Sequence, residues 1–509
     1  MKPIERRKFL QLAGAGAGAV VLSSLFCDQL FAGMILKPGE ELFASRFGVT
    51  REVMKKVLDA ALSKGGDFAE LFFEYALNNN VVMEDDIIRE STEDITLGVG
   101  IRVLSGKQTG YAYTSDLSPE TMRHTALTAA AIASSPAKVR MAAIKPVQPG
   151  RQVYLMTSPF ADAPLGDRIT LVQEAYAAAK AHDPRITKVV ANLADSLQCV
   201  TIVNSDGRMV SDARPQVRLR ASATAEEGGK RVTGSSNKGG RVGMTFYRTA
   251  GTTPKEIGEA AAKEAVILLA ATDPAPGEWP VVLSNFHSGV MVHEAVGHPL
   301  EADGNWQKTS IMWDKMGQMV ADPSVTIYDD ATIPHYRGSL NIDDEGTPTT
   351  KVVMIEKGRL VGYLHDRLSA RILNMKPNGH GRRQRFSSMP IPRMNNTVLA
   401  PGSASAADII KSVQKGFYAQ SYAGGMVENT GKFTFSVNLG YAIEDGKLTQ
   451  PVKNATLIGT NVQILKEMEM IGNDTEFFLG TCGKAGQAAA VTAGTPTFKI
   501  RKMTVGGRS

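Results

Sequence analysis

Apolar residues recur at helical spacing in several segments of the N-terminal half of this 509-residue chain. In residues 50–62 they stand at Val53, Met54, Val57 and Leu58, which predicts an amphipathic helix. Residues 118–132 predict a second helix, which Ser118 can cap. Two further helices are predicted over residues 165–182 and 254–271, the first of them closed by Asp183-Pro184.

Between the predicted helices, the apolar positions follow the pattern of β-strands. Strands are predicted over residues 69–75, 95–103 and 109–114, and strands dominate residues 186–248. The turn residues Asn204-Ser205-Asp206-Gly207 follow the apolar run 200–203, which predicts a β-hairpin at this position. The N-terminal half is therefore expected to be a mixture of helices and sheet.

A proline-rich segment marks the best predicted domain boundary. Residues 273–280 contain Pro274, Pro276 and Pro280, and proline neither continues a helix nor fits a central strand. The fold class predicted is α+β, with an N-terminal α/β-mixed region followed by a strand-rich C-terminal domain that carries the HExxxH helix. The predicted division is 50–272 for an N-terminal α+β domain, 273–280 for the linker and 281–509 for a C-terminal domain.

Composition places the chain among ordinary globular proteins. Hydrophobic residues make up 43% and charged residues 21%, which is enough apolar material for a sizeable core. The net charge of +6 is small for this length, and no recognisable nucleic-acid module accompanies it, so no nucleic-acid partner is predicted.

The first 32 residues have the features of an export signal. Arg6-Arg7 precedes Phe9-Leu10 and a modest Gly/Ala-rich apolar stretch, which resembles a twin-arginine signal peptide cleaved near Ala32. The apolar stretch is shorter than the roughly 20 residues that span a bilayer, so no stable membrane span is predicted. We expect the mature protein to be periplasmic. Lipidation at Cys27 is disfavoured because the large Phe26 precedes it.

The segment His293-Glu294-Ala295-Val296-Gly297-His298 has the composition of a zinc site. Zinc binds imidazole nitrogen, and a neighbouring glutamate can act as a general base. On an ideal α-helix, two histidines five residues apart point about 140° away from each other. A π-type turn brings them to within about 50°, and Gly297 and Pro299 suit such a distortion. The sequence therefore predicts a π-type turn in a helix that begins near Phe286 and is capped by Ser284 or Asn285.

A catalytic zinc needs a third protein ligand, and the residues leave two sources open. Glu301 and Asp303 follow the helix directly. Cys482 lies far downstream between Thr481 and Gly483, with Lys484 nearby to favour the thiolate. If Cys482 is the ligand, Glu301 and Asp303 become partners that orient the imidazoles.

Other polar residues can either take part in binding or have only a structural role. Arg382, Arg383 and Arg385 can grip a substrate carboxylate or oxyanion, or belong to a solvated loop. The acidic segment 343–345 lacks the spacing of a calcium loop, so a solvated turn is predicted. His287 lies off the face of His293 and is predicted to be structural.

Taken together, these motifs resemble the TldD/PmbA family of bacterial metallopeptidases, on its TldD side. The resemblance covers the C-terminal half nearly throughout and rests on several blocks in order: His293 to Glu301, Gly379 to Arg383, Met389 to Met394, Gly424-Gly425, Thr456 to Gly459, Gly472 to Asp474, Cys482 to Gln487 and Thr504 to Gly507.

The resemblance implies a Zn²⁺ peptidase that cleaves short or unfolded peptides. It implies ligands at His293, His298 and Cys482, with Glu294 as the base. It also implies a homodimer or a heterodimer with a PmbA-like subunit. The predicted export leader departs from the familiar cytoplasmic members. The competing hypotheses are a metal-free modulator or scaffold subunit and a zinc hydrolase of non-peptide amides. A Cys199–Cys482 disulfide would contradict the metal model.

Overall fold

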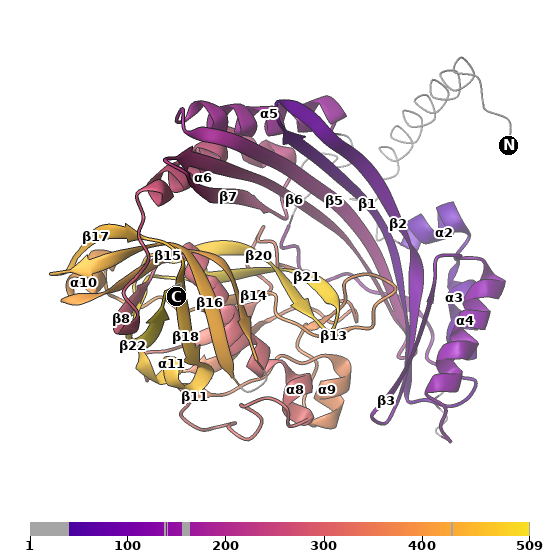
Figure 1. The fold of residues 1–509 in the computed structure, drawn as a ribbon. Coiled ribbons are helices and arrows are strands. Elements are labelled where there is room, and N and C mark those ends of the chain that lie inside the picture. The colour runs from indigo at the N-terminus through magenta and orange to yellow at the C-terminus, as the bar shows by residue number, and fades with distance from the viewer. Residues whose placement is uncertain (1–39, 137–138, 140, 155–162, 429–430, 508–509) are drawn as a thin grey trace, which may run out of the picture.

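The computed structural model describes residues 40–136, 139, 141–154, 163–428 and 431–507. The predicted leader, residues 1–32, lies outside these ranges. The chain forms a mixed α+β structure in which a long curved sheet arches over a second, strand-rich body (Figure 1). Among the described residues, no helix combines the length and the apolar composition needed to cross a bilayer.

The arch is a single sheet built from long antiparallel hairpins. Its strands lie in the order β3-β2-β1-β5-β6, with β7 and the short β4 also paired to β6. Their bounds are β1 Phe68–Glu84, β2 Ile87–Ser105, β3 Gln108–Thr114, β4 Lys145–Pro146, β5 Ile186–Asn204, β6 Arg208–Glu227 and β7 Lys230–Gly240.

The hairpin predicted at residues 204–207 is confirmed by the turn between β5 and β6. The strand predicted at residues 69–75 is longer than expected, because β1 continues through Asn78, Asn79 and Asn80. Tertiary pairing overrides the poor strand propensity of asparagine here. β1 is hydrogen-bonded to β2 on one side and to β5 on the other, and the Asn80 side chain bonds Glu90 and Asn192.

Helices cover the convex face of the arch. Three of them have a capping side chain at the N-terminus: Thr50, Ser118 and Thr253 each accept a hydrogen bond from a backbone N–H of the first turn. Ser118 is the predicted cap, and Thr253 forms a capping box with Glu256. The helices are α2 Glu40–Phe47, α3 Arg51–Ala61, α4 Pro119–Ile132, α5 Leu165–Ala181 and α6 Pro254–Leu269.

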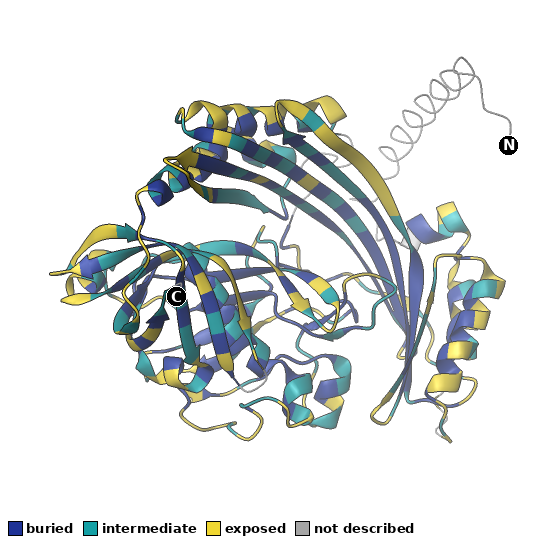
Figure 2. Ribbon diagram, in the orientation of Figure 1, coloured by how far each residue is buried: buried dark blue, intermediate teal, exposed yellow. Residues whose placement is uncertain are grey.

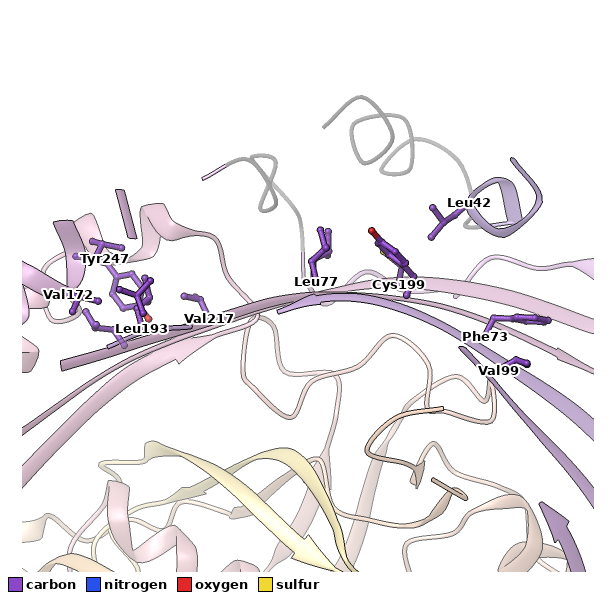
Figure 3. Close-up of a cluster of buried hydrophobic side chains, with 14 of the residues drawn as sticks. Leu42, Phe73, Leu77, Val99, Val172, Leu193, Cys199, Val217 and Tyr247 are labelled. Carbon is purple, nitrogen blue, oxygen red and sulfur yellow. The ribbon is translucent and has the colours of Figure 1, made fainter. Parts of the chain in front are cut away.

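The two faces of the arch differ in polarity because strand residues alternate between them. Val217, Leu193 and Val172 join the hydrophobic core on the convex, helix-covered side (Figure 3). The strands in Figure 2 show this alternation as bands of buried and less buried residues. The residues between the core positions of β6, such as Arg214 and Arg218, therefore face the C-terminal body.

The C-terminal body contains two sheets. One has the order β11-β10-β9-β14-β21-β20, which leaves β20 at an edge. The other has the order β15-β8-β22-β18-β16-β17, and pairing of β15 with β16 closes five of its strands into a ring. Their bounds are β8 Gly277–Leu283, β9 Ile327–Asp330, β10 Lys351–Glu356, β11 Arg359–Leu360, β14 Asn396–Leu399, β15 Lys415–Val427, β16 Lys432–Glu444, β17 Lys447–Val452, β18 Ala455–Thr460, β20 Glu476–Lys484, β21 Gln487–Thr495 and β22 Phe498–Gly506.

Short elements complete this body. They are α8 Ala302–Trp306, α9 Arg367–Ile372, α10 Ala406–Lys411, α11 Asn461–Glu467, β19 Met468–Glu469 beside β22, and the two-stranded pair β12 Gly381–Arg382 and β13 Ile391–Pro392. The core of the body is a second hydrophobic cluster, separate from that of the arch.

Pro280 lies in β8, a central strand, which the sequence analysis did not allow. The strand tolerates it because the register with β22 shifts there: Trp279 pairs with Met503 and Val281 with Ile500, so no ladder partner faces Pro280. Pairing with β15 begins only at Val281. The missing N–H of proline therefore costs no hydrogen bond.

The acidic segment 343–345 corrects another expectation, because all three side chains are buried rather than solvated. The carboxylate of Glu345 accepts from Arg102 of β2 at 2.5 Å, and Asp344 accepts from Arg214 of β6 at 2.5 Å. These ion pairs join the body to the arch. A buried carboxylate requires such partners, and here they come from strands distant in sequence.

Candidate metal centre

The helix that carries both histidines changes its winding within a few residues. Phe286–Ser288 is a 3-10 turn, α7 Gly289–Val292 is α-helical, His293–Gly297 is a π-turn, and His298–Leu300 is again 3-10. The N–H of His298 donates to the carbonyl of His293, five residues back. This confirms the π-type turn predicted from the histidine spacing.

Two local details differ from the prediction. Ser284 and Asn285 do not cap the helix, since their side chains donate to the carbonyls of Gln420 and Asp474. Gly297 has ordinary helical angles, so its conformational freedom is not what the turn needs. A Cβ at Gly297 would lie 1.8 Å from the sulfur of Met394, so the glycine is required by close packing.

The π-turn brings His293 and His298 together with Cys482. One donor atom from each lies within 4.8 Å of the others, and Cys482 Sγ is 3.3 Å from His298 Nε2. The two imidazole rings are 5.2 Å apart between centroids and nearly perpendicular, at 82°. Such a cluster of two imidazoles and a thiol has the donor set of a catalytic zinc site with one open position.

Cys482 reaches the histidines because it lies near the end of β20, just before the tight turn at Ala485 and Gly486. Burial would raise the pKa of its thiol, but His293 and His298 outweigh this effect and lower the pKa to about 4. The thiolate is the form that binds a metal. Cys199 lies in the core on the convex face of the arch (Figure 3), away from the two histidines, so the Cys199–Cys482 disulfide that would contradict the metal model is absent from the described residues.

Glu301 fixes the orientation of His298. Its Oε2 lies 2.9 Å from His298 Nδ1, which leaves Nε2 directed toward Cys482. Burial would raise the pKa of Glu301, but Lys484 and His298 hold it at about 2. Lys484 lies 3.0 Å from Glu301 and 2.7 Å from Asp303. Asp303 is thus engaged by lysine and orients neither imidazole, contrary to the expectation for it.

His293 shows that the cluster is prepared for a ligand. Both of its ring nitrogens are buried, and within the described ranges neither meets hydrogen-bonding geometry with any neighbour. A buried polar atom without a partner carries a free-energy cost, which a bound cation removes. The donor set and this unpaired imidazole therefore fit a zinc ion.

Glu294 stands beside the cluster without belonging to it. Its Oε2 lies 3.6 Å from His298 Nε2, and its side chain keeps 19% of its exposure. Glu294 and the three donor residues line a cleft with a volume of about 730 Å³. The glutamate thus has access to both the metal position and the solvent in the cleft.

The cleft contains residues that the sequence analysis did not assign to the site. His287, Tyr422 and Phe478 give an aromatic lining, with the His287 and Phe478 rings 4.8 Å apart. Burial lowers the pKa of His287 to about 4, and its Nδ1 accepts from the backbone N–H of Tyr422. His287 was predicted to be structural, and its hydrogen bond to the backbone agrees with this. The prediction did not include its position in the cleft lining. Helical spacing could not reveal this, because Phe478 arrives from another strand.

Arg382 and Arg383 do not line the cleft, and neither sequence interpretation holds for them. Arg382 donates to the carbonyls of Met394 and Ala490. Arg383 is buried and pairs with Glu70 of β1 at 2.6 Å. Both arginines therefore bond to other segments of the folded chain, and only Arg385 of this cluster is exposed.

Three family models match the chain in sequence. The PmbA/TldA metallopeptidase domain 1 matches residues 69–133, the central domain residues 158–269 and the C-terminal domain residues 276–507. These matches follow the division into arch and body, with the third covering all three donor residues.

One curated relative is similar over nearly the whole chain, and another over about half of it. A metalloprotease TldD homolog of Haemophilus influenzae is 37% identical over 467 residues, covering 90% of this chain and 97% of its own length. A zinc metalloprotease TldD homolog of Saccharolobus solfataricus is 32% identical over 246 residues, which is 48% of this chain and 55% of that protein.

Solved structures share the fold. A Thermotoga maritima protein described as a candidate modulator of a DNA gyrase has a TM-score of 0.73 at 23% identity, covering 90% of this chain and 100% of that one. TldE from Thermococcus kodakarensis has a TM-score of 0.69 at 18% identity, covering 89% of this chain and 100% of its own.

Proposed function

Because the chain belongs to the PmbA/TldD metallopeptidase family, we propose that it is a zinc-dependent peptidase with His293, His298 and Cys482 as metal ligands. The observation that carries this proposal is the convergence of the three donor atoms within 4.8 Å, around a buried imidazole that has no other partner. The relative whose name specifies zinc supports the choice of metal.

The chemistry divides between the ion and Glu294. A bound zinc supplies a Lewis acid that polarises a carbonyl oxygen and acidifies water. Glu294, with its carboxylate at the mouth of the cluster, takes the proton of the attacking water and passes it to the leaving amine. Glu301 keeps His298 in one orientation throughout, since it holds the ring nitrogen that faces away from Cys482.

An unpaired strand edge in the cleft favours extended substrates. Within the described residues, β15 pairs with β8 only through residues 417–419. Its exposed residues 423–426 line the cleft, and Gly424, Gly425 and Met426 pair with β16 on their other side. On β20 the carbonyls of Gly480 and Cys482 already accept from Arg337 and Arg393. An unfolded peptide can therefore add to the β15 edge through its backbone, which a folded protein cannot do.

Export and assembly form the remaining parts of the proposal. The twin-arginine signal in residues 1–32 supports a periplasmic protein, exported in a folded state. The fold shared with TldE supports pairing either with a PmbA-like subunit or with a second copy of this chain. Amino-terminal sequencing of exported material and the mass of the native complex test these two points.

The test of the mechanism is Glu294→Gln in the full chain. Cleavage of an internally quenched, unstructured peptide should fall by about 10²–10⁴-fold, because a general base contributes on this order. Zinc content, measured by mass spectrometry of the metal, should remain at the level of the unaltered chain. Glu476→Gln, an exposed change on β20 outside the cleft lining, is the matched control and should retain activity. Full activity of the Glu294 variant would exclude it as the base.

A further inference from the structure

The arch contributes one residue to the cleft lining within the described part of the chain, and that residue is Arg218 of β6. Its neighbours Val217 and Leu219 point into the core on the convex side, so Arg218 points toward the C-terminal body. Figure 3 shows Val217 on that convex side. Arg218 therefore brings a positive charge from the arch to the site built by the body.

The charge of Arg218 has no acidic partner among the described residues. Its Nε donates to the amide oxygen of Asn237 at 3.1 Å, and no carboxylate lies within ion-pair distance of its guanidinium. Burial lowers the pKa of Arg218, and the neighbouring cation Arg220 lowers it further. A half-buried guanidinium in this setting attracts an anion from solution.

A second arginine adds to this positive field beside the metal ligands. Arg337 donates to the carbonyl of Gly480 at 3.1 Å and to Thr481 Oγ1 at 3.3 Å, and both of these residues line the cleft. Burial, followed by Arg218 and two further arginines, lowers the pKa of Arg337 to about 9. The described residues place no carboxylate in an ion pair with Arg337 either.

Three acidic side chains of the cleft are engaged elsewhere. Glu301 and Asp303 are held by Lys484, and Glu294 stands next to His298. Glu428, near the end of β15, also lines the cleft. Three buried arginines of this protein have carboxylate partners: Arg102 pairs with Glu70 and Glu345, Arg214 with Asp344, and Arg383 with Glu70. Arg382 and Arg241 have none among the described residues, but they donate to backbone carbonyls and do not line the cleft. Arg218 differs from all of these in lining the cleft without a carboxylate partner.

We propose that Arg218 binds a carboxylate of the peptide, that Arg337 adds to the positive charge at this position, and that the site therefore prefers acidic peptides. The carboxylate is a side chain of Glu or Asp, or the C-terminal group of the peptide. Gly480 lies two residues from Cys482 on β20, roughly 7 Å along an extended strand. The carboxylate is therefore expected about two to four residues from the cleaved bond. This inference rests on the proposed peptidase function.

The experiment uses matched peptides and the zinc-loaded full chain. In one series, a neutral, amidated, internally quenched peptide carries a single Glu or Gln at each position in turn. In a second series, the same neutral peptide has a free or an amidated C-terminus. One carboxylate position should raise kcat/KM by about ten-fold over its neutral counterpart, as expected for a charged hydrogen bond. The series that shows the effect identifies the source of the carboxylate.

Arg218→Gln should abolish this preference, because kcat/KM should fall by about ten-fold more for the preferred carboxylate peptide than for its neutral counterpart. Arg220→Gln is the matched control: it removes an exposed arginine two residues away on the same strand, outside the cleft lining, and should keep the preference. Equal loss on charged and neutral peptides, or no preference in the unaltered chain, would overturn the proposal.

Binding separates this proposal from the peptidase function. The affinities of the same peptide pairs are measured by fluorescence anisotropy in the Glu294→Gln background, with and without Arg218→Gln. A carboxylate preference that disappears with Arg218 supports the subsite even if no peptide is cleaved, a result that would defeat only the peptidase proposal. Equal affinity for charged and neutral peptides in both backgrounds refutes the subsite, whatever the activity.

Discussion

The metal cluster and the ion pairs between the arch and the body are both buried, polar and assembled from distant parts of the sequence. In the ion pairs, arginine guanidinium groups meet carboxylates: Arg102 bonds Glu70 and Glu345, and Arg383 bonds Glu70. In the metal cluster, three side chains that can bind a metal lie together, and His293 meets no hydrogen-bond geometry with a neighbour among the described residues. The ion pairs bring opposite charges together, whereas the metal cluster gathers groups that a cation can bind.

The difference shows that burial of charge does not by itself identify a functional site. The segment 343–345, with Arg383 beside it, also holds buried ionisable groups, but Asp344 and Glu345 meet arginines of opposite charge. The presence of an opposite charge therefore separates this network from the metal cluster, which gathers two imidazoles and a thiol. Among the described residues, the absence of a carboxylate partner likewise distinguishes Arg218 and Arg337 from Arg102, Arg214 and Arg383.

The largest effect is expected from breaking the metal cluster. Cys482→Ser replaces the thiolate with a weak ligand, so zinc should fall from about one ion per chain to nearly none, and peptidase activity should fall with it. Metal analysis after dialysis and peptide cleavage measure the two changes. Cys199→Ala, which removes the other described thiol, is the control and should keep zinc. Full zinc retention in the Cys482 variant would remove Cys482 from the ligand set.

A smaller effect, on stability alone, is expected from breaking the ion-pair network. Arg102→Met leaves Glu70 and Glu345 with fewer buried partners, which should lower the free energy of unfolding by about 3–5 kcal/mol. Zinc binding in the folded variant should persist. The comparison is Arg89→Met on the same strand, whose exposed pair with Asp85 should contribute roughly 0–1 kcal/mol. Equal losses in urea unfolding of both variants would contradict the distinction.

The last effect depends on pH and concerns one carboxyl group within the network. Burial, with Glu345 nearby, raises the pKa of Asp366 to about 7, above the roughly 3.9 of an unfolded chain. The folded state therefore holds this proton more tightly. Its contribution to stability is fully present below about pH 4 and is lost as the pH rises through about 7.

Asp366→Asn should remove this pH dependence, since the amide stays neutral and can still accept the hydrogen bond from Ser369 at the start of α9. The variant should be more stable than the unaltered chain at pH 8 by up to about 4 kcal/mol, the free energy that corresponds to a folded pKa of about 7 and an unfolded pKa of roughly 3.9. At pH 4, where both side chains are neutral, urea unfolding should give nearly equal stabilities. A constant difference between the two chains across this range would refute the assignment.

Local patterns predicted much of the arch and one unusual feature of the site. The helical periodicity of residues 50–62 and the turn residues after 203 act over a few positions, and the structure has the expected helix and hairpin. The histidine spacing predicted the π-turn because helix geometry is fixed over five residues. The strand at Asn78–Asn80 was missed, because its stability comes from pairing on both sides.

The sequence by itself therefore determined the donor types, the distorted helix and the family to which the blocks belong. Tertiary structure alone decided which carboxylate pairs with which cation, as the pairs Arg383–Glu70 and Lys484–Asp303 show. It also decided why residue 297 is glycine, through contact with Met394, and which arginine reaches the cleft. The physical reason is the same throughout: burial and charge pairing depend on distances between strands hundreds of residues apart, which no local pattern encodes.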